Sequence, residues 1–166
     1  MRPYHKLILF FLLLFCVSDV FSQATDTAKL NFIKRQFVQI NRNLKSYKKI
    51  EKTDTAQMAE GNIVLLFYSD KELKKIAARY YGETGKALQE YYFSDNKLIF
   101  CYYADYHYNM PIHETGGGKV VSTKEKRIYL DKSRIFLIKK KPANLKNSAI
   151  FSVDPQAEAR RLINLK

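Results

Sequence analysis

The residues best able to do chemistry are two histidines that lie near carboxylates in one segment of the chain. His107 and His113 belong to the stretch Asp105–Thr123, with Asp105 and Glu114 as neighbours. Imidazole and carboxylate groups are common ligands of zinc and similar ions. The spacing of the two histidines, however, fits neither a common zinc pattern nor a helical i, i+4 pair. We therefore expect solvated loop residues and no metal site, and keep a metal-dependent hydrolase using this loop as an alternative.

Other catalytic patterns are missing from the sequence. There is no G-x-S-x-G nucleophile motif, and Cys101 lies inside an apolar run, as a buried cysteine does. The triple glycine 116–118 is not followed by the Lys-Ser/Thr of a phosphate-binding loop. Carboxylates such as Asp70, Asp95 and Asp131 lie at predicted turns, where aspartate is common. We predict a protein that is not an enzyme, with no catalytic residue and no cofactor.

The chain is strongly basic, with 29 Lys and Arg against 16 Asp and Glu and a net charge of +13. The cations concentrate in residues 27–50 and 115–166, whereas most of the Phe and Tyr residues lie between Phe67 and Tyr108. Proteins that hold single-stranded nucleic acid need rings and cations on one surface, so this separation along the chain makes nucleic acid an improbable partner. We expect an anionic envelope component or a protein partner. The alternative is that the lysines only keep the surface soluble.

The first residues resemble an export signal. A basic start is followed by the apolar run Leu7–Val17 and by small or apolar residues at Val20 and Ser22, as in a secretory signal peptide. The run is too short to span a bilayer. We predict a signal peptide over residues 1–22, a single domain over 23–166, and a periplasmic or secreted location.

Hydrophobic spacing predicts an α+β fold. Apolar residues fall on one helical stripe within Ala28–Lys49: Leu30, Ile33, Phe37, Ile40, Leu44 and Tyr47. Short β-branched or aromatic segments then alternate with Asp, Asn and Gly turns, the pattern of antiparallel hairpins. Asp154 and Pro155 mark the start of a short C-terminal helix. We predict an N-terminal amphipathic helix packed on an antiparallel meander of five or six strands.

Three pairs of adjacent tyrosines bear on binding: Tyr80-Tyr81, Tyr91-Tyr92 and Tyr102-Tyr103. Neighbouring strand residues face opposite sides of a sheet. If the first helix covers one face, the other tyrosine of each pair is either exposed or covered by the C-terminal segment. An exposed set would form a binding surface, whereas cross-strand ladders would only stabilise the sheet. The candidate binding residues are Tyr81, Tyr91, Tyr103, Tyr106, Tyr108, His107 and His113.

One stretch of the chain carries a resemblance. The phrase Tyr80–Lys86, continuing through Glu90–Phe93 and Asn96–Phe100, is similar to a pattern in small exported proteins of Bacteroidota-type bacteria, as are Tyr108–Pro111 and Glu125–Ile135. The resemblance implies a helix with a meander and an envelope location, and it brings no activity with it. We therefore expect an exported, non-enzymatic binding module of the bacterial envelope. Inhibition of an acidic enzyme is a further alternative, because a basic inhibitor would be attracted to it.

Overall fold

The computed structural model describes residues 26–55, 61–142 and 152–166. Residues 1–22, predicted to be a signal peptide, lie outside this part of the chain. A helix over residues 26–42 comes first and is followed by η1 (Leu44–Ser46), a short 3₁₀ turn. The strands are β1 (Lys48–Lys52), β2 (Ile63–Ser69), β3 (Glu72–Gly82), β4 (Gly85–Ser94), β5 (Lys97–Tyr108), β6 (Val120–Asp131) and β7 (Arg134–Lys141), and α3 (Pro155–Ile163) closes the chain.

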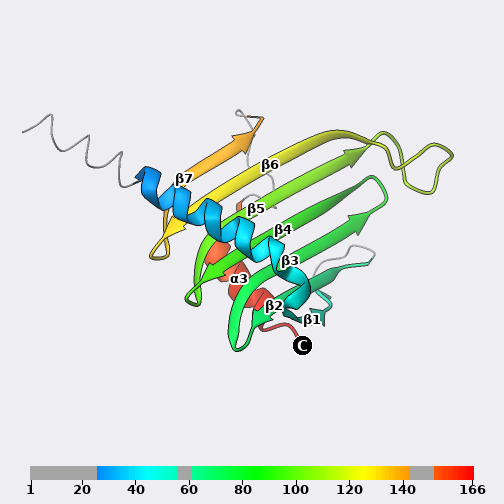
Figure 1. Ribbon diagram of the computed structural model, residues 1–166. Coiled ribbons are helices and arrows are strands. Elements are labelled where there is room, and N and C mark those ends of the chain that lie inside the picture. The colour runs from blue at the N-terminus through cyan, green and yellow to red at the C-terminus, as the bar shows by residue number, and fades with distance from the viewer. Residues whose placement is uncertain (1–25, 56–60, 143–151) are drawn as a thin grey trace, which may run out of the picture.

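The strands form one seven-stranded antiparallel sheet in which each strand pairs with the next along the sequence (Figure 1). Two of the turns place consecutive residues at positive φ, Asp95-Asn96 between β4 and β5 and Lys132-Ser133 between β6 and β7. This is the backbone of tight two-residue hairpins. The predicted α+β class and meander are therefore confirmed, although the sheet has seven strands and not five or six.

The additional strand is β1, and its first residues were predicted to belong to the N-terminal helix. The N-terminal helix ends at residue 42, and Tyr47 is already extended, with φ −80° and ψ 143°. Residues 48–52 pair with β2 in register, from Lys48 opposite Tyr68 to Lys52 opposite Val64. Backbone groups must find partners, and the edge of β2 supplies them to β1. The prediction of a helix up to Lys49 was wrong at its end, although Tyr47 still packs beneath the helix.

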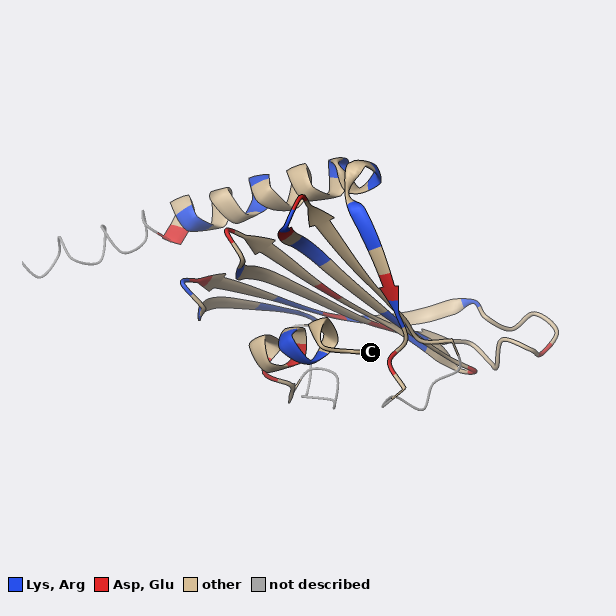
Figure 2. Ribbon diagram, turned by 90° about the horizontal axis from the view of Figure 1, so that it is seen from below, with Lys and Arg blue, Asp and Glu red and all other residues tan. Residues whose placement is uncertain are grey.

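Two helices lie on opposite sides of the sheet, so the molecule has three layers (Figure 2). Ile33 and Ile40 of the N-terminal helix pack on Tyr92, Phe100 and Tyr129, and we call this side the helix face. On the other side, called the α3 face, Ala159 and Leu162 join a larger cluster of buried side chains: Val64, Leu66, Ile76, Tyr91, Cys101, Tyr103, Ile128 and Leu130 among others. Both faces are therefore apolar at their centres.

The predicted start of the last helix is confirmed. Asp154 is its N-cap, with its carboxylate accepting a 2.9 Å hydrogen bond from the Gln156 amide, and Pro155 is the first helical residue. Asp54, in the loop after β1, is completely buried and binds the Arg161 guanidinium through both oxygens, at 3.0 and 2.6 Å. The Tyr80 hydroxyl donates a further bond to Asp54 at 3.1 Å. These contacts fasten α3 to the sheet.

Candidate functional site

The N-terminal helix crosses the strands and covers one band of its face (Figure 1). Lys29 near its start pairs with Asp131 at the end of β6, Phe37 contacts Phe100 on β5, and Asn41 reaches Tyr92 on β4. A helix is about 10 Å wide, whereas the twelve residues of β5 extend over roughly 40 Å. The half of the helix face nearest the β3–β4 turn is therefore free of cover by any described element (Figure 2); we call it the open face.

Of the tyrosines predicted to bind, two lie on the open face. Tyr81 is 38% exposed, and Tyr106 is half-buried in the same cross-strand row. In that row, Tyr81 on β3 is opposite Lys86 on β4, which is opposite Tyr106 on β5. Tyr108 is half-buried at the end of β5, where its amide donates to the carbonyl of Thr84 at 2.9 Å.

The other two tyrosines belong to the core. Tyr91 and Tyr103 are 0% and 1% exposed beneath α3, with their rings edge to face at 5.8 Å. Their selection as binding residues was wrong, and so was the idea of a bare tyrosine surface opposite the first helix. The physical reason is the short last helix: Leu162 and its neighbours supply the apolar cover that these rings need.

The two candidate histidines are not brought together as a metal site. His107 Nε2 lies 3.2 Å from Asp105 Oδ2 and 3.3 Å from Lys124 Nζ, whereas His113 is exposed in the β5–β6 loop. Across residues 26–55, 61–142 and 152–166, no cluster of three or more His, Cys, Asp or Glu side chains is placed to hold an ion. The loop itself is shorter than predicted, because Asp105 pairs with Lys124 in the extended strands and leaves only residues 109–119.

Rings and cations meet on the open face, where Arg79 and Lys86 of the ring-rich segment are joined by Arg127 from the basic C-terminal part of the sequence. The ammonium of Lys86 lies 5.1 Å from the centre of the Tyr106 ring, and the Arg127 guanidinium lies 5.5 Å from that of Tyr102. These distances are typical of cation–π contacts. A hollow of about 310 Å³ is formed here by Arg79, Tyr81, Lys86, Ala87, Leu88 and Tyr106. It sits at the far end of the face from the helix.

A second hollow lies where the open face meets the N-terminal helix. It has a volume of about 410 Å³ and is lined by Ile33, Lys34, Phe37, Val38, Phe100, Arg127 and Tyr129. Arg127 therefore borders this groove while it also covers the ring of Tyr102. The two hollows belong to one continuous face, because Phe100, Tyr102 and Tyr106 follow one another on the same side of β5.

The open face is cationic, since its acids are already paired. The Glu90 carboxylate is bound by Lys75 at 2.7 Å and by the Tyr92 hydroxyl at 2.6 Å, and that of Glu125 is bound by Arg127 at 2.6 Å. Within the described chain, several cations of this face have no acidic partner: Lys34, Arg79, Lys86, Lys139 and Lys141. Lys139 and Lys141 are included because they lie directly opposite Arg127 and Glu125 on β7.

A buried lysine marks the border between the open face and the helix. Lys75 is 5% exposed; it donates to Asn41 Oδ1 at 2.9 Å and lies 4.7 Å from the centre of the Tyr92 ring. Burial lowers the pKa of Lys75, and the charge of Glu90 opposes this effect. The contacts join the end of the helix to β3 and β4, so we assign Lys75 a structural role.

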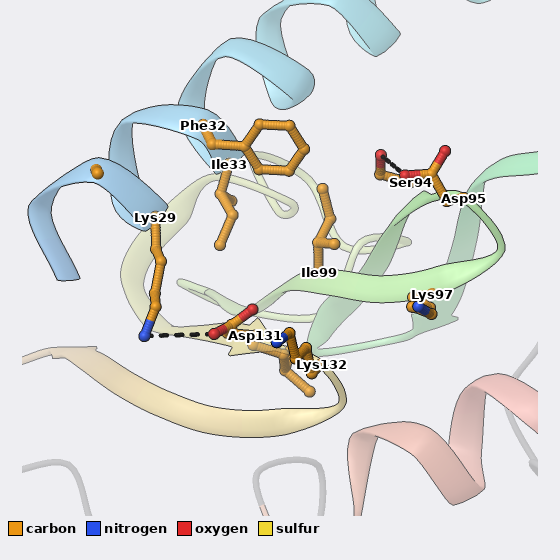
Figure 3. A pocket seen from close by; sticks show the side chains of 11 residues that line it. Lys29, Phe32, Ile33, Ser94, Asp95, Lys97, Ile99, Asp131 and Lys132 are labelled. Atoms are coloured by element: carbon orange, nitrogen blue, oxygen red, sulfur yellow. Dashed lines mark hydrogen bonds and ion pairs between the residues drawn. The ribbon is translucent and has the colours of Figure 1, made fainter. Parts of the chain in front are cut away.

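Another hollow, of about 380 Å³, lies on the opposite flank of the helix near the hairpin turns (Figure 3). Figure 3 shows Lys29 facing Asp131, at 3.3 Å, below Phe32 and Ile33. Lys29 also pairs with Asp26 at 3.3 Å. Positive and negative side chains are both present here and partly neutralise each other. This hollow therefore selects for the charge of a ligand less clearly than the open face does.

Sequence reasoning missed the cations that define the open face. Arg79 and Lys86 lie in strand segments whose tyrosines drew attention, and each stands between apolar or small neighbours, whereas Arg127 follows the charged run Lys124–Lys126. That alternation was the available signal, since it marks the solvent side of a strand. Which rings share that side depends on the strand register and could not be read from spacing alone.

Comparison with known proteins adds no identification. No family model matches the chain, and neither a curated protein nor a solved structure matches it. None of the helices in the described residues is both long enough and apolar enough to span a bilayer.

Proposed function

We propose that the protein is an exported, non-enzymatic binding module that holds an anionic component of the bacterial envelope on its open face. The observation that carries the proposal is the combination of exposed cations and tyrosine rings on one half of one face, with the nearby acids already paired. The export part rests on the signal-like pattern of residues 1–22.

Charge complementarity favours an anionic ligand. Glu90 and Glu125 have side chains only 17% and 16% exposed, so they contribute little repulsion to an approaching anion. The cations around them reach solvent, as the 42% exposed side chain of Arg127 does. A patch of one charge raises the local concentration of oppositely charged ligands and speeds their association.

The lining of the face favours binding over catalysis. A site for acid–base or nucleophilic chemistry needs a reactive group with an activating partner in reach. The cations here are instead placed over rings, and the carboxylates are already held by Lys75 and Arg127. Tyrosine adds contact area with little loss of side-chain freedom, as it does in other binding surfaces.

The experiment measures the affinity of the purified protein for inorganic polyphosphate, which supplies negative charge without sugars or bases. The test variant is the double substitution Arg79→Glu with Lys86→Glu on the open face. The matched control is Lys45→Glu with Lys48→Glu, which makes the same change in net charge at exposed residues outside this face. We expect the test variant to bind at least about tenfold more weakly, equivalent to about 1.4 kcal/mol, and the control to bind within about threefold of the parent.

Equal losses in the two variants would mean that binding follows net charge and not the open face. Failure of the parent protein to bind polyphosphate in low salt would also contradict the proposal, because an exposed cationic face must attract a polyanion there. Binding by the parent is expected to weaken as salt is added.

A further inference from the structure

The length of the open face and the distance between its two hollows suit a polymer ligand. Phe100 in the groove beside the helix and Tyr106 in the far hollow are six residues apart on β5, which is roughly 20 Å along an extended strand. Tyr102 and Arg127 lie between them and connect the two hollows. A ligand that uses both hollows must therefore be an extended chain.

The side chains that line the open face can bind more features of a ligand than its negative charge. Phenol hydroxyls both donate and accept hydrogen bonds, and the rings of Tyr81 and Tyr106 with the side chain of Leu88 offer apolar surface beside the cations. A chain of acidic sugars presents carboxylates, hydroxyls and the apolar C–H faces of its rings together. Polyphosphate offers only the charge.

Single-stranded nucleic acid fits this lining less well. Its bases are held mainly by stacking on free aromatic faces. On the open face, however, Lys86 already occupies one side of the Tyr106 ring and Arg127 one side of the Tyr102 ring. The cations would have to leave the rings before bases could stack on those sides.

A lipid surface fits the shape less well. The N-terminal helix rises above the sheet along one border of the open face, and the β5–β6 loop projects beyond the strands (Figure 2). A flat bilayer would meet the helix before the sheet, whereas a single chain can lie on the sheet beside the helix (Figure 2).

We propose that the open face binds an acidic polysaccharide, laid along the strands from the groove at Phe37 and Phe100 to the hollow at Tyr81, Lys86 and Tyr106. This inference rests on the proposed function, and it specifies the chemical class of the anionic ligand. Carboxylates of the chain contact Lys86, Arg79 and Arg127. The sugar rings lie against Tyr81, Leu88 and Tyr106.

The experiment compares oligogalacturonates of two lengths, a disaccharide and a hexasaccharide, by calorimetry with the purified protein. Inorganic polyphosphate, a thymidine oligonucleotide and vesicles containing an anionic phospholipid are measured beside them. The variant is Tyr106→Ala, which removes a ring and leaves the charge unchanged. Phe32→Ala is the matched control, because Phe32 is 39% exposed on the other flank of the helix.

We expect the hexasaccharide to bind at least about tenfold more tightly than the disaccharide, as a ligand spanning two subsites should. Tyr106→Ala should weaken hexasaccharide binding by about tenfold and leave polyphosphate binding unchanged. Phe32→Ala should change neither, and Tyr106→Phe should retain most of the hexasaccharide affinity because it keeps the ring.

Four results would overturn the inference. If polyphosphate binds but Tyr106→Ala does not weaken the hexasaccharide, the ligand is recognised by charge alone, and the proposed function stands without this extension. If the oligonucleotide or the vesicles bind more tightly than the hexasaccharide, the ligand belongs to another class. If the disaccharide binds as tightly as the hexasaccharide, the site takes a small ligand. Absence of binding to every polyanion would remove the proposed function as well.

Discussion

The two faces of the sheet use the same residue type in opposite ways. On the α3 face, Tyr91 and Tyr103 are buried, and the Tyr91 hydroxyl donates to Gln89 at 2.8 Å. On the helix face, Tyr102 and Tyr106 lie next to solvent and contact cations. Tyr102 and Tyr103 are adjacent in sequence, yet one belongs to the open face and the other to the core.

The difference arises from where each helix lies. Both faces have a helix across them, but α3 is tied to the sheet by charged groups, with Arg161 on the buried Asp54 and the half-buried Lys52 ammonium on the carbonyl of Ile163 at 2.7 Å. The N-terminal helix packs over the band that contains Tyr92 and Phe100, and leaves the rest of its face to polar residues. One face thus serves stability. The other combines a stabilising band with a surface that no described element covers.

The largest expected contrast is between two tyrosines of β5. Tyr103→Ala removes a ring that is 1% exposed and leaves a cavity, so we expect the free energy of unfolding to fall by about 4 kcal/mol. Tyr106→Ala removes a half-buried ring at the surface and should lower it by less than about 1 kcal/mol. Urea unfolding of both variants measures this. Similar losses would mean that the two faces do not differ as described.

A smaller contrast separates the ion pairs of the two faces. Asp54→Ala leaves the Arg161 guanidinium with only Glu158 and deprives the Tyr80 hydroxyl of its acceptor. We expect a loss of about 3 kcal/mol, because the charge-assisted bonds between Arg161 and the buried Asp54 are lost and the buried Tyr80 hydroxyl is left without its acceptor. Glu125→Ala breaks the half-exposed pair with Arg127 and should cost less than about 1 kcal/mol. Chemical denaturation gives both values, and a larger loss for Glu125→Ala would reverse the assignment of roles.

The smallest effect per residue appears at alkaline pH. Burial raises the pKa of Tyr80, Tyr91 and Tyr103 above the ordinary 10.0. The folded protein therefore holds these protons more tightly than the unfolded chain does, and the stability they contribute is complete below pH 10 and decreases as the pH rises above it. Above pH 10, each such tyrosine lowers the free energy of unfolding by about 1.4 kcal/mol per pH unit.

Urea unfolding at a series of pH values above 10 measures this loss. The Tyr91→Phe variant is the comparison, since it lacks one of the titrating groups and should lose stability less steeply. Lys75 acts in the opposite direction, because its pKa is lowered from 10.5 and its burial penalty is relieved as the pH approaches that value. One lysine offsets only part of the effect of three tyrosines. Unchanged stability above pH 10 would contradict the burial of these hydroxyls.

Much of the fold followed from local patterns. The Asp154-Pro155 start of α3 was predictable because a cap and a first-turn proline act within a few residues. Six of the strands were located by their turn residues and apolar segments. The β1 strand was missed, since the helical spacing of Leu44 and Tyr47 continued past the point where pairing with β2 takes over. The open face was not predicted as a surface: Tyr81 and Tyr106 were named without their cations, and the binding surface was expected on the side opposite the first helix.

By itself, the sequence determined the α+β class, the strong positive charge and the period of each element, because composition and spacing act locally along the chain. Only the tertiary structure decided which tyrosines meet solvent. Strand register sets which of two neighbouring rings faces which helix, and the crossing direction of the N-terminal helix sets how much of its face stays open. The contacts of Arg127 with Tyr102 and of Lys86 with Tyr106 also depend on the pairing of β5 with β6 and β4. No local sequence pattern specifies that pairing.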